Sequence, residues 1–200
     1  MKYDILFAGV GGQGVLSMAA IIGRAAIAHG LHAKQSEVHG MAQRGGAVQA
    51  HLRLSDRAIA SDLIGHGMAE LVLSLEPLES LRYLEYLSPR GALVTAAEPF
   101  ANIPDYPELA ALHARVRALP HGVLVEAERL ASEAGDAQMV NTVMVGAASP
   151  FLPMDAVHLE AAVRENFSRK GEVTVNLNLA AFRAGRAAAS ALASAVPERT

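Results

Sequence analysis

The chain has 200 residues, a formal net charge of −3 at pH 7 and 52% hydrophobic residues. This length favours one domain over residues 1–200 with a sizeable core, and the weak negative charge argues against nucleic-acid binding, which needs a basic surface. Because the chain has no cysteine, it cannot form disulfides, thiolate nucleophiles or cysteine-ligated zinc and iron–sulfur centres.

Membrane insertion and secretion are not indicated by the sequence. No stretch approaches the ~20 uninterrupted apolar residues that a transmembrane helix needs. The first residues lack the longer apolar run and the cleavage site of a secretory signal. We therefore expect no membrane contact and a cytoplasmic location.

The start of the chain predicts a strand, a glycine turn, a helix and a second strand. The first strand covers residues 4–9 and the second covers residues 31–36. Residues 14–29 predict a helix that is apolar on almost all sides. Such a helix must be buried against a broad surface, so we expect it to lie on a sheet.

The turn between this strand and helix has the pattern G-x-G-x-x-G at residues 9–14. Glycines there let the backbone turn tightly and let a ligand approach the free N–H groups of the helix start. The spacing to Glu37 roughly matches the acid, ~20 residues on, that binds a ribose hydroxyl in dinucleotide sites. Bound NAD or FAD, another phosphate-bearing ligand and a purely structural turn all remain open. The residues expected to contact a ligand or a partner are Gly11, Gly12, Gln13 and Gly14.

Residues 37–46 combine three glycines with an acid, a histidine and an arginine, which indicates a shaped functional loop rather than a helix or strand. His39 could carry a proton, and Arg44 could bind a carboxylate or phosphate through two N–H groups. Arg44 could equally pair with an acid or anchor an interface. No residue is expected to be catalytic, and the histidine spacing predicts no metal site. The candidate contact residues are Glu37, His39, Gln43, Arg44, Gly45 and Gly46.

The rest of the chain predicts an α/β fold with a mixed sheet. Residues 47–54 alternate between apolar and polar side chains, which is typical of a half-buried antiparallel strand, and residues 57–61 could return as its hairpin partner. The expected architecture is a three-layer Rossmann-like domain with a mostly parallel, mixed sheet. Further strands are predicted at residues 70–75, 92–96 and 121–126, and further helices at residues 77–87, 108–119, 127–134, 141–148, 156–167 and 177–196.

Four segments, taken in order along the chain, resemble the gamma-type domain of the 2-oxoacid:ferredoxin oxidoreductases. The segment from Ser36 to Gly46 is the most specific of them, and it is similar to the branch of the family that acts on indolepyruvate. The resemblance covers nearly the whole chain. The four segments are residues 9–14, 36–46, 141–146 and 178–185.

This resemblance implies the small subunit of a complex, inactive alone. A large partner subunit would hold thiamine diphosphate, magnesium and iron–sulfur clusters and decarboxylate an aryl-pyruvate such as indolepyruvate. Electrons would pass to ferredoxin, and coenzyme A would take the acyl group. The glycine turn would contact coenzyme A or the partner, and the loop at 37–46 would face the partner near its active site. A stand-alone NAD(P)- or FAD-binding oxidoreductase and a pure scaffold remain alternatives.

Overall fold

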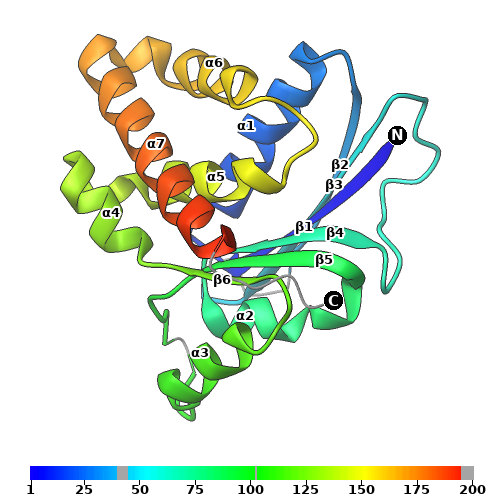
Figure 1. Cartoon of the computed structure of the whole chain (residues 1–200), viewed down its shortest axis with the longest axis vertical. Helices are drawn as coiled ribbons and strands as arrows, with labels where there is room; N and C mark the ends of the chain where they lie inside the picture. Colours follow the sequence, from blue (N-terminus) through cyan, green and yellow to red (C-terminus); the bar gives the residue numbers. More distant parts are fainter. Residues whose placement is uncertain (40–44, 102, 195–200) are drawn as a thin grey trace.

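One six-stranded sheet forms the centre of the computed structural model, which describes residues 1–39, 45–101 and 103–194 (Figure 1). The strands are β1 (Lys2–Val10), β2 (His32–His39), β3 (Ala47–Ser55), β4 (Ala69–Ser74), β5 (Leu87–Ala96) and β6 (Gly122–Val125). Their order in the sheet is β2-β3-β1-β4-β5-β6. Of these strands only β3 runs antiparallel to its neighbours, β1 and β2, so the predicted mixed and mostly parallel sheet is confirmed.

Helices cover both faces of the sheet and give the predicted three layers. The helices are α1 (Val15–Ala28), α2 (Pro77–Arg82), α3 (Leu109–Arg117), α4 (Ala127–Ala134), α5 (Val140–Ala148), α6 (Ala156–Phe167) and α7 (Glu172–Ser194). We call the face covered by α1 and α4–α7 the upper face, and the face covered by α2 and α3 the lower face (Figure 1). The connections from β1 and from β4 therefore use helices on opposite faces.

The apolar core lies mainly under the upper face. Phe7, Ile22 and Phe182 are fully buried there, among the side chains that β1, α1 and α7 bring together. A smaller cluster on the lower face contains Leu6 and Leu93. The central strands β4 and β5 are apolar on both sides because both of their faces are covered, as is usual for parallel strands.

Several predicted boundaries were wrong. The loop predicted at 37–46 begins later, since residues 32–39 pair with β3 and extend β2 through Glu37 and His39. Residues 57–61 form no strand, because β3 already has β1 and β2 on its two sides. The helix that starts at Pro77 ends at Arg82, and Leu87 begins β5 instead. The last helix starts at Glu172, five residues before the predicted position.

Within the described part of the chain, no helix is both long enough and apolar enough to cross a membrane.

The other helices predicted from periodicity agree closely with the structure. The segments predicted at 14–29, 127–134, 141–148 and 156–167 correspond to α1, α4, α5 and α6 with ends that differ by at most one residue.

Candidate functional site at the carboxyl edge of the sheet

The connections of the sheet change direction between β1 and β4. From β1 the chain passes through α1 to β2 on one side, and from β4 it passes through α2 to β5 on the other side. Since β1 and β4 are parallel neighbours, their carboxyl ends lie together. Ligands of open α/β sheets bind outside the carboxyl ends of strands at such a reversal. The fold therefore places the turn at 9–14 where a ligand site is expected.

The two glycine-rich segments meet at this edge through their backbones. The Gly11 N–H donates to the Gly46 carbonyl at 2.8 Å, and the Gly45 N–H donates to the Gly11 carbonyl at 3.3 Å. These bonds continue the β1–β3 ladder beyond its last pair, Val10 and Ala47. Both segments thus belong to one surface. The Gly11 N–H and the Gly46 carbonyl are already bonded to each other.

Gln13 holds the turn together from inside the fold. Its side-chain Oε1 accepts a hydrogen bond from the Val10 N–H at 2.8 Å, and its Nε2 donates to the Leu75 carbonyl at 3.2 Å. The side chain thereby connects the ends of β1 and β4. Contact of Gln13 with a ligand or partner stays a prediction, and its amide already has these two partners within the chain.

Gly12 is the exposed residue of this turn, which leads into the first turn of α1. Gly12 is exposed with φ +103°, and a Cβ there would meet no described atom within 4 Å, so the left-handed backbone is the reason for glycine. Gly14, at φ +84°, lies against Asn141, whose Nδ2 donates to the Gly14 carbonyl at 3.4 Å. The N–H groups of Val15 and Leu16 find no acceptor among the described residues. Such a helix start favours an anion.

The acid and the histidine of the second segment lie farther away. Glu37 and His39 are on β2, the outermost strand, and β3 separates β2 from β1. At ~4.8 Å between neighbouring strands, the ends of β1 and β2 are ~10 Å apart. In a dinucleotide site, the acid lies on the strand next to the one that leads into the glycine turn. Glu37 does not lie on such a strand, because β3 is between β2 and β1. Gln43 and Arg44 lie outside the described residues.

Two acids at this edge were missed by the sequence reasoning. Glu76 follows β4, is 1% exposed, and caps α2 by accepting the Glu79 N–H at 2.7 Å on Oε2, while its Oε1 accepts the Tyr106 hydroxyl. Burial and the Glu76 carboxylate raise the pKa of Tyr106 above its usual value. Glu98 follows β5 and accepts two N–H groups from the first turn of α4 at 3.2 Å each. For Glu76, the sequence held a signal: an acid directly before Pro77 is typical of a residue that caps the start of a helix.

Both acids position helices, since Glu76 caps α2 and Glu98 accepts N–H groups at the start of α4. Burial raises the pKa of Glu98, and backbone N–H groups oppose that shift. Across the described ranges, no group of three or more histidine, aspartate and glutamate side chains is arranged to hold a metal ion. The edge therefore offers backbone N–H groups and shape more than side-chain chemistry, which suits binding.

Known protein sequences similar to this chain identify its family. Residues 4–188 match the sequence profile of the pyruvate ferredoxin/flavodoxin oxidoreductase family. The chain belongs to this family. Within it, the indolepyruvate oxidoreductase subunit IorB of Archaeoglobus fulgidus is 36% identical over 194 residues, which are 92% of this chain and 94% of that protein.

Solved structures of the oxidoreductase family share the fold. The gamma subunit of a keto/oxoacid ferredoxin oxidoreductase from Geobacter sulfurreducens has a TM-score of 0.68 and 27% identity, over 94% of this chain and 99% of that one. A 2-oxoglutarate:ferredoxin oxidoreductase from Magnetococcus marinus, solved with 2-oxoglutarate, coenzyme A and succinyl-CoA bound, has a TM-score of 0.76 and 23% identity. The match spans 100% of this chain and 33% of that chain, so a domain of this shape is also built into longer oxidoreductases.

These relatives confirm the predicted resemblance and the enzyme class. The homologues are subunits of 2-oxoacid:ferredoxin oxidoreductases, and they imply a partner subunit for this chain. The alternative of a stand-alone NAD(P)- or FAD-binding enzyme finds no support among them. The position of β3 between β1 and β2 gives the physical reason, because it separates Glu37 from the glycine turn.

Proposed function

We propose that this chain is the small subunit of a complex that oxidises indolepyruvate or a similar aryl-pyruvate, and that it is inactive alone. The 36% identity with an indolepyruvate oxidoreductase subunit over 92% of the chain supports this substrate class. The absence of cysteine supports a division of labour, since this chain has no thiolate for an iron–sulfur cluster. In this proposal, the chain acts as one gamma-type domain in the cytoplasm.

The large partner would hold thiamine diphosphate, magnesium and the clusters, and the complex would transfer electrons to ferredoxin. The 2-oxoacid would lose carbon dioxide and two electrons, and coenzyme A would take the acyl group as a thioester. This chain contributes binding surface to that reaction. Its residues would orient the partner and coenzyme A, while the bond-breaking steps take place on the partner.

The pairing of the two glycine segments at the carboxyl edge is the observation that carries the proposal. Gly12 and Gly45 are both exposed there, next to the paired backbones of Gly11 and Gly46 and before the start of α1. The phosphates of coenzyme A are anions, and the N–H groups of Val15 and Leu16 suit an anion at a helix start. Arg44, next to Gly45 in sequence, would add a positive charge beside the glycine segments.

Co-expression with the large subunit tests the proposal. Dye reduction that depends on indolepyruvate is expected from the complex and not from the small chain alone. Arg44→Ala should raise the KM for coenzyme A about tenfold, the loss of one charge-assisted contact. Arg24→Ala, which removes an exposed arginine of α1, is the matched control and should change neither KM nor assembly.

Three results would contradict the proposal. Activity of the isolated chain would show that it is an enzyme by itself. Saturable binding of NAD(P) or FAD to the isolated chain, measured by calorimetry, would favour a nucleotide-dependent enzyme. Weaker assembly of Arg44→Ala on size exclusion, with unchanged turnover and KM in the assembled fraction, would favour a scaffold.

A further inference from the structure

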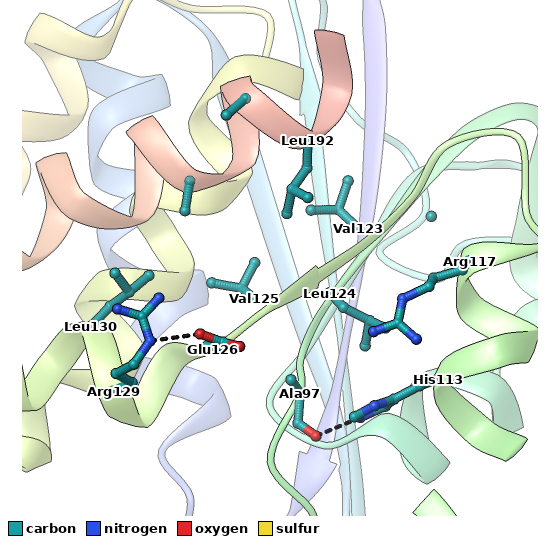
Figure 2. A pocket seen from close by; sticks show the side chains of 13 residues that line it. Ala97, His113, Arg117, Val123, Leu124, Val125, Glu126, Arg129, Leu130 and Leu192 are labelled. Carbon is teal, nitrogen blue, oxygen red and sulfur yellow. Dashed lines mark hydrogen bonds and ion pairs between the residues drawn. The ribbon is translucent and has the colours of Figure 1, made fainter. Parts of the chain in front are cut away.

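A hollow of about 660 Å³ lies beside β6, the last strand of the sheet, away from the glycine turn (Figure 2). Helix α3 lines it on the lower face, and α4 and α7 line it on the upper face. The residues of β6 form its floor. The hollow therefore follows the outer edge of the sheet.

The backbone of β6 has hydrogen-bonding groups that point into this hollow. On the inner side, the Leu93 N–H donates to the His121 carbonyl at 3.0 Å and the Ala97 N–H donates to the Val125 carbonyl at 2.8 Å. Because backbone groups alternate along a strand, the N–H and C=O of Leu124 point away from β5. No residue in the described ranges bonds to them. An open edge of this kind is a template for another strand.

The hollow reaches both faces of the sheet at this edge. Val123 and Val125 belong to the upper core and face Leu130 of α4 and Leu192 of α7 (Figure 2). Leu124 belongs to the lower cluster, on the side of α3. An added strand would place successive side chains alternately into the upper and lower parts.

The charges differ between the two parts. In the lower part, the Arg117 guanidinium points toward the hollow and has no carboxylate partner among the described residues (Figure 2). On the other side, Arg129 is already paired with Glu126 at 2.6 Å and with Glu133 at 2.7 Å. The lower part thus suits an acidic side chain, and the upper part, lined by Leu130 and Leu192, suits an apolar one.

We propose that the outer edge of β6 binds an extended segment of another polypeptide as a seventh strand. The residue opposite Leu124 would be acidic and would pair with Arg117, while its two neighbours would be apolar and would pack against α4 and α7. Main-chain bonds to Leu124 would give affinity, and the alternate side chains would give specificity. The proposal does not depend on the oxidoreductase function, since it uses only this chain.

Titration of the isotope-labelled full chain with the peptide acetyl-Thr-Val-Glu-Val-Thr-amide tests this surface by NMR. The largest shifts are expected at the Leu124 amide and the Arg117 Nε. A peptide with lysine in place of glutamate should bind at least about tenfold more weakly. Absence of shifts at Leu124 up to millimolar peptide would overturn the proposal.

A pair of variants separates the main-chain contact from the side chain. Leu124→Pro removes the outward N–H, which an outer strand tolerates, and should abolish peptide binding. Leu124→Ala keeps the N–H and should bind within about threefold of the unchanged chain. Equal binding by both variants would overturn the proposal.

A third variant keeps the test decisive if Leu124→Pro does not fold. Arg117→Glu changes an exposed side chain and should reverse the preference toward the lysine peptide. An unchanged preference would overturn the charge match. Acetate that shifts Arg117 as strongly as the peptide does, with no shift at Leu124, would indicate a small-anion site instead. A concentration-dependent dimer that protects the Leu124 amide without peptide would identify a second copy as the occupant.

Discussion

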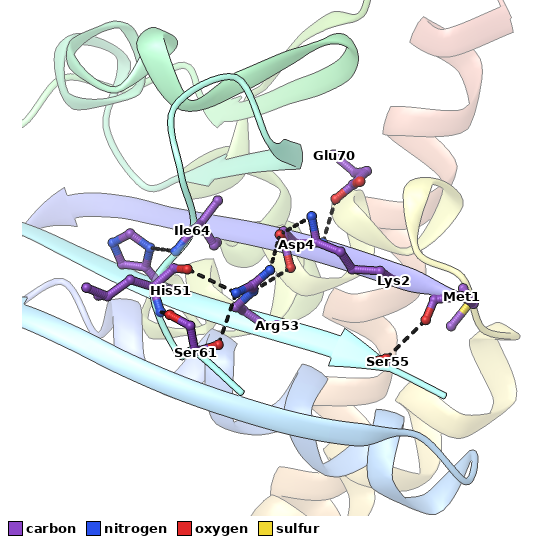
Figure 3. Close-up of polar contacts among 10 residues, drawn as sticks. Met1, Lys2, Asp4, His51, Arg53, Ser55, Ser61, Ile64 and Glu70 are labelled. Carbon is purple, nitrogen blue, oxygen red and sulfur yellow. Dashed lines mark hydrogen bonds and ion pairs between the residues drawn. The ribbon is translucent and has the colours of Figure 1, made fainter. Parts of the chain in front are cut away.

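The upper and lower faces of the sheet are held in different ways. On the upper face, long helices pack closely on one another and on the strands, and the contact between α5 and α7 depends on glycines at both sides. On the lower face, next to β3, residues 56–64 have no helix or strand and are tied to the sheet by polar bonds (Figure 3). Apolar packing therefore stabilises one face, and a few charged side chains stabilise this part of the other.

The polar bonds to this segment come from side chains on two neighbouring strands, β2 and β3. Arg53 on β3 binds the buried Asp4 with two bonds, of 3.0 and 3.1 Å, and donates to the carbonyls of Ser61 and Leu63 (Figure 3). Lys34 on β2 donates to two further carbonyls of the same segment. His51 accepts the Ile64 N–H on Nδ1 at 3.1 Å. These contacts replace the regular structure that the segment lacks.

The largest expected effect concerns the helix contact of the upper face. A Cβ at Gly146 would overlap the Phe182 carbonyl of α7, and neither backbone can move without disturbing the core. Gly146→Ala should therefore lower the free energy of unfolding by about 3 kcal/mol or more, measured by urea denaturation.

The matched control is the same substitution in α1. A Cβ at Gly23 would lie 3.6 Å from Leu52 Cδ1, an ordinary contact, and its helix would gain propensity. Gly23→Ala should thus raise the free energy of unfolding by up to about 1 kcal/mol. Equal losses from both substitutions would show that the close approach of α5 and α7 is not special.

A smaller effect is expected from the polar bonds of the lower face. Arg53→Met leaves the carboxylate of Asp4, which is 0% exposed, with Lys2 at 2.8 Å as its cation. Since removal of one partner leaves a buried charge poorly compensated, the free energy of unfolding should fall by about 2–3 kcal/mol. Faster amide exchange is expected over residues 56–64 in the same variant.

Lys34→Met is the control for this prediction, because Lys34 is exposed and its Nζ bonds, among the described residues, to the carbonyls of Ile59 and Ala60. Its loss should cost no more than about 1 kcal/mol. A similar cost for both variants would mean that the segment does not depend on the buried Arg53–Asp4 pair.

The difference between the faces explains which parts of the fold could be predicted. Helices of the upper face carry regular apolar periodicity, so α4 and α6 were predicted at their observed ends. Residues 57–61 were predicted as a hairpin strand from their local pattern alone. That pattern contains no information on the two strands, β1 and β2, that already pair with β3. Leu87 was predicted to end a helix because it continues a helical spacing of leucines. In the structure it pairs with Ala69 of β4 and belongs to β5.

The candidate site could be predicted in position but only partly in detail. The pattern at 9–14 indicated a turn at the edge of an α/β sheet, and the structure brings Gly11 next to Gly46. The inward direction of Gln13 depends on Leu75, which is far away in sequence, so no local pattern could show it. The same holds for Glu76 and Tyr106, which come together only through the fold.

The smallest effect expected on the lower face is a dependence of stability on pH. Burial lowers the pKa of His51 below its usual value of 6.5, and Arg53 adds to this shift while Asp62 and Asp4 oppose it. The unfolded chain therefore takes up a proton near pH 6.5, where the folded chain still resists it. Stability must fall as the pH drops from about 6.5 toward the pKa of the folded state, and it is fully present above that window.

His51→Asn isolates this contribution, because the asparagine Oδ1 can still accept the Ile64 N–H but does not titrate. The free energy of unfolding of both chains should be measured by urea denaturation between about pH 5 and pH 8. The difference between the chains should be constant above about pH 7 and should shift in favour of the variant as the pH falls. Parallel profiles would show that His51 keeps an ordinary pKa in the fold, and that the bond to Ile64 does not depend on a neutral ring.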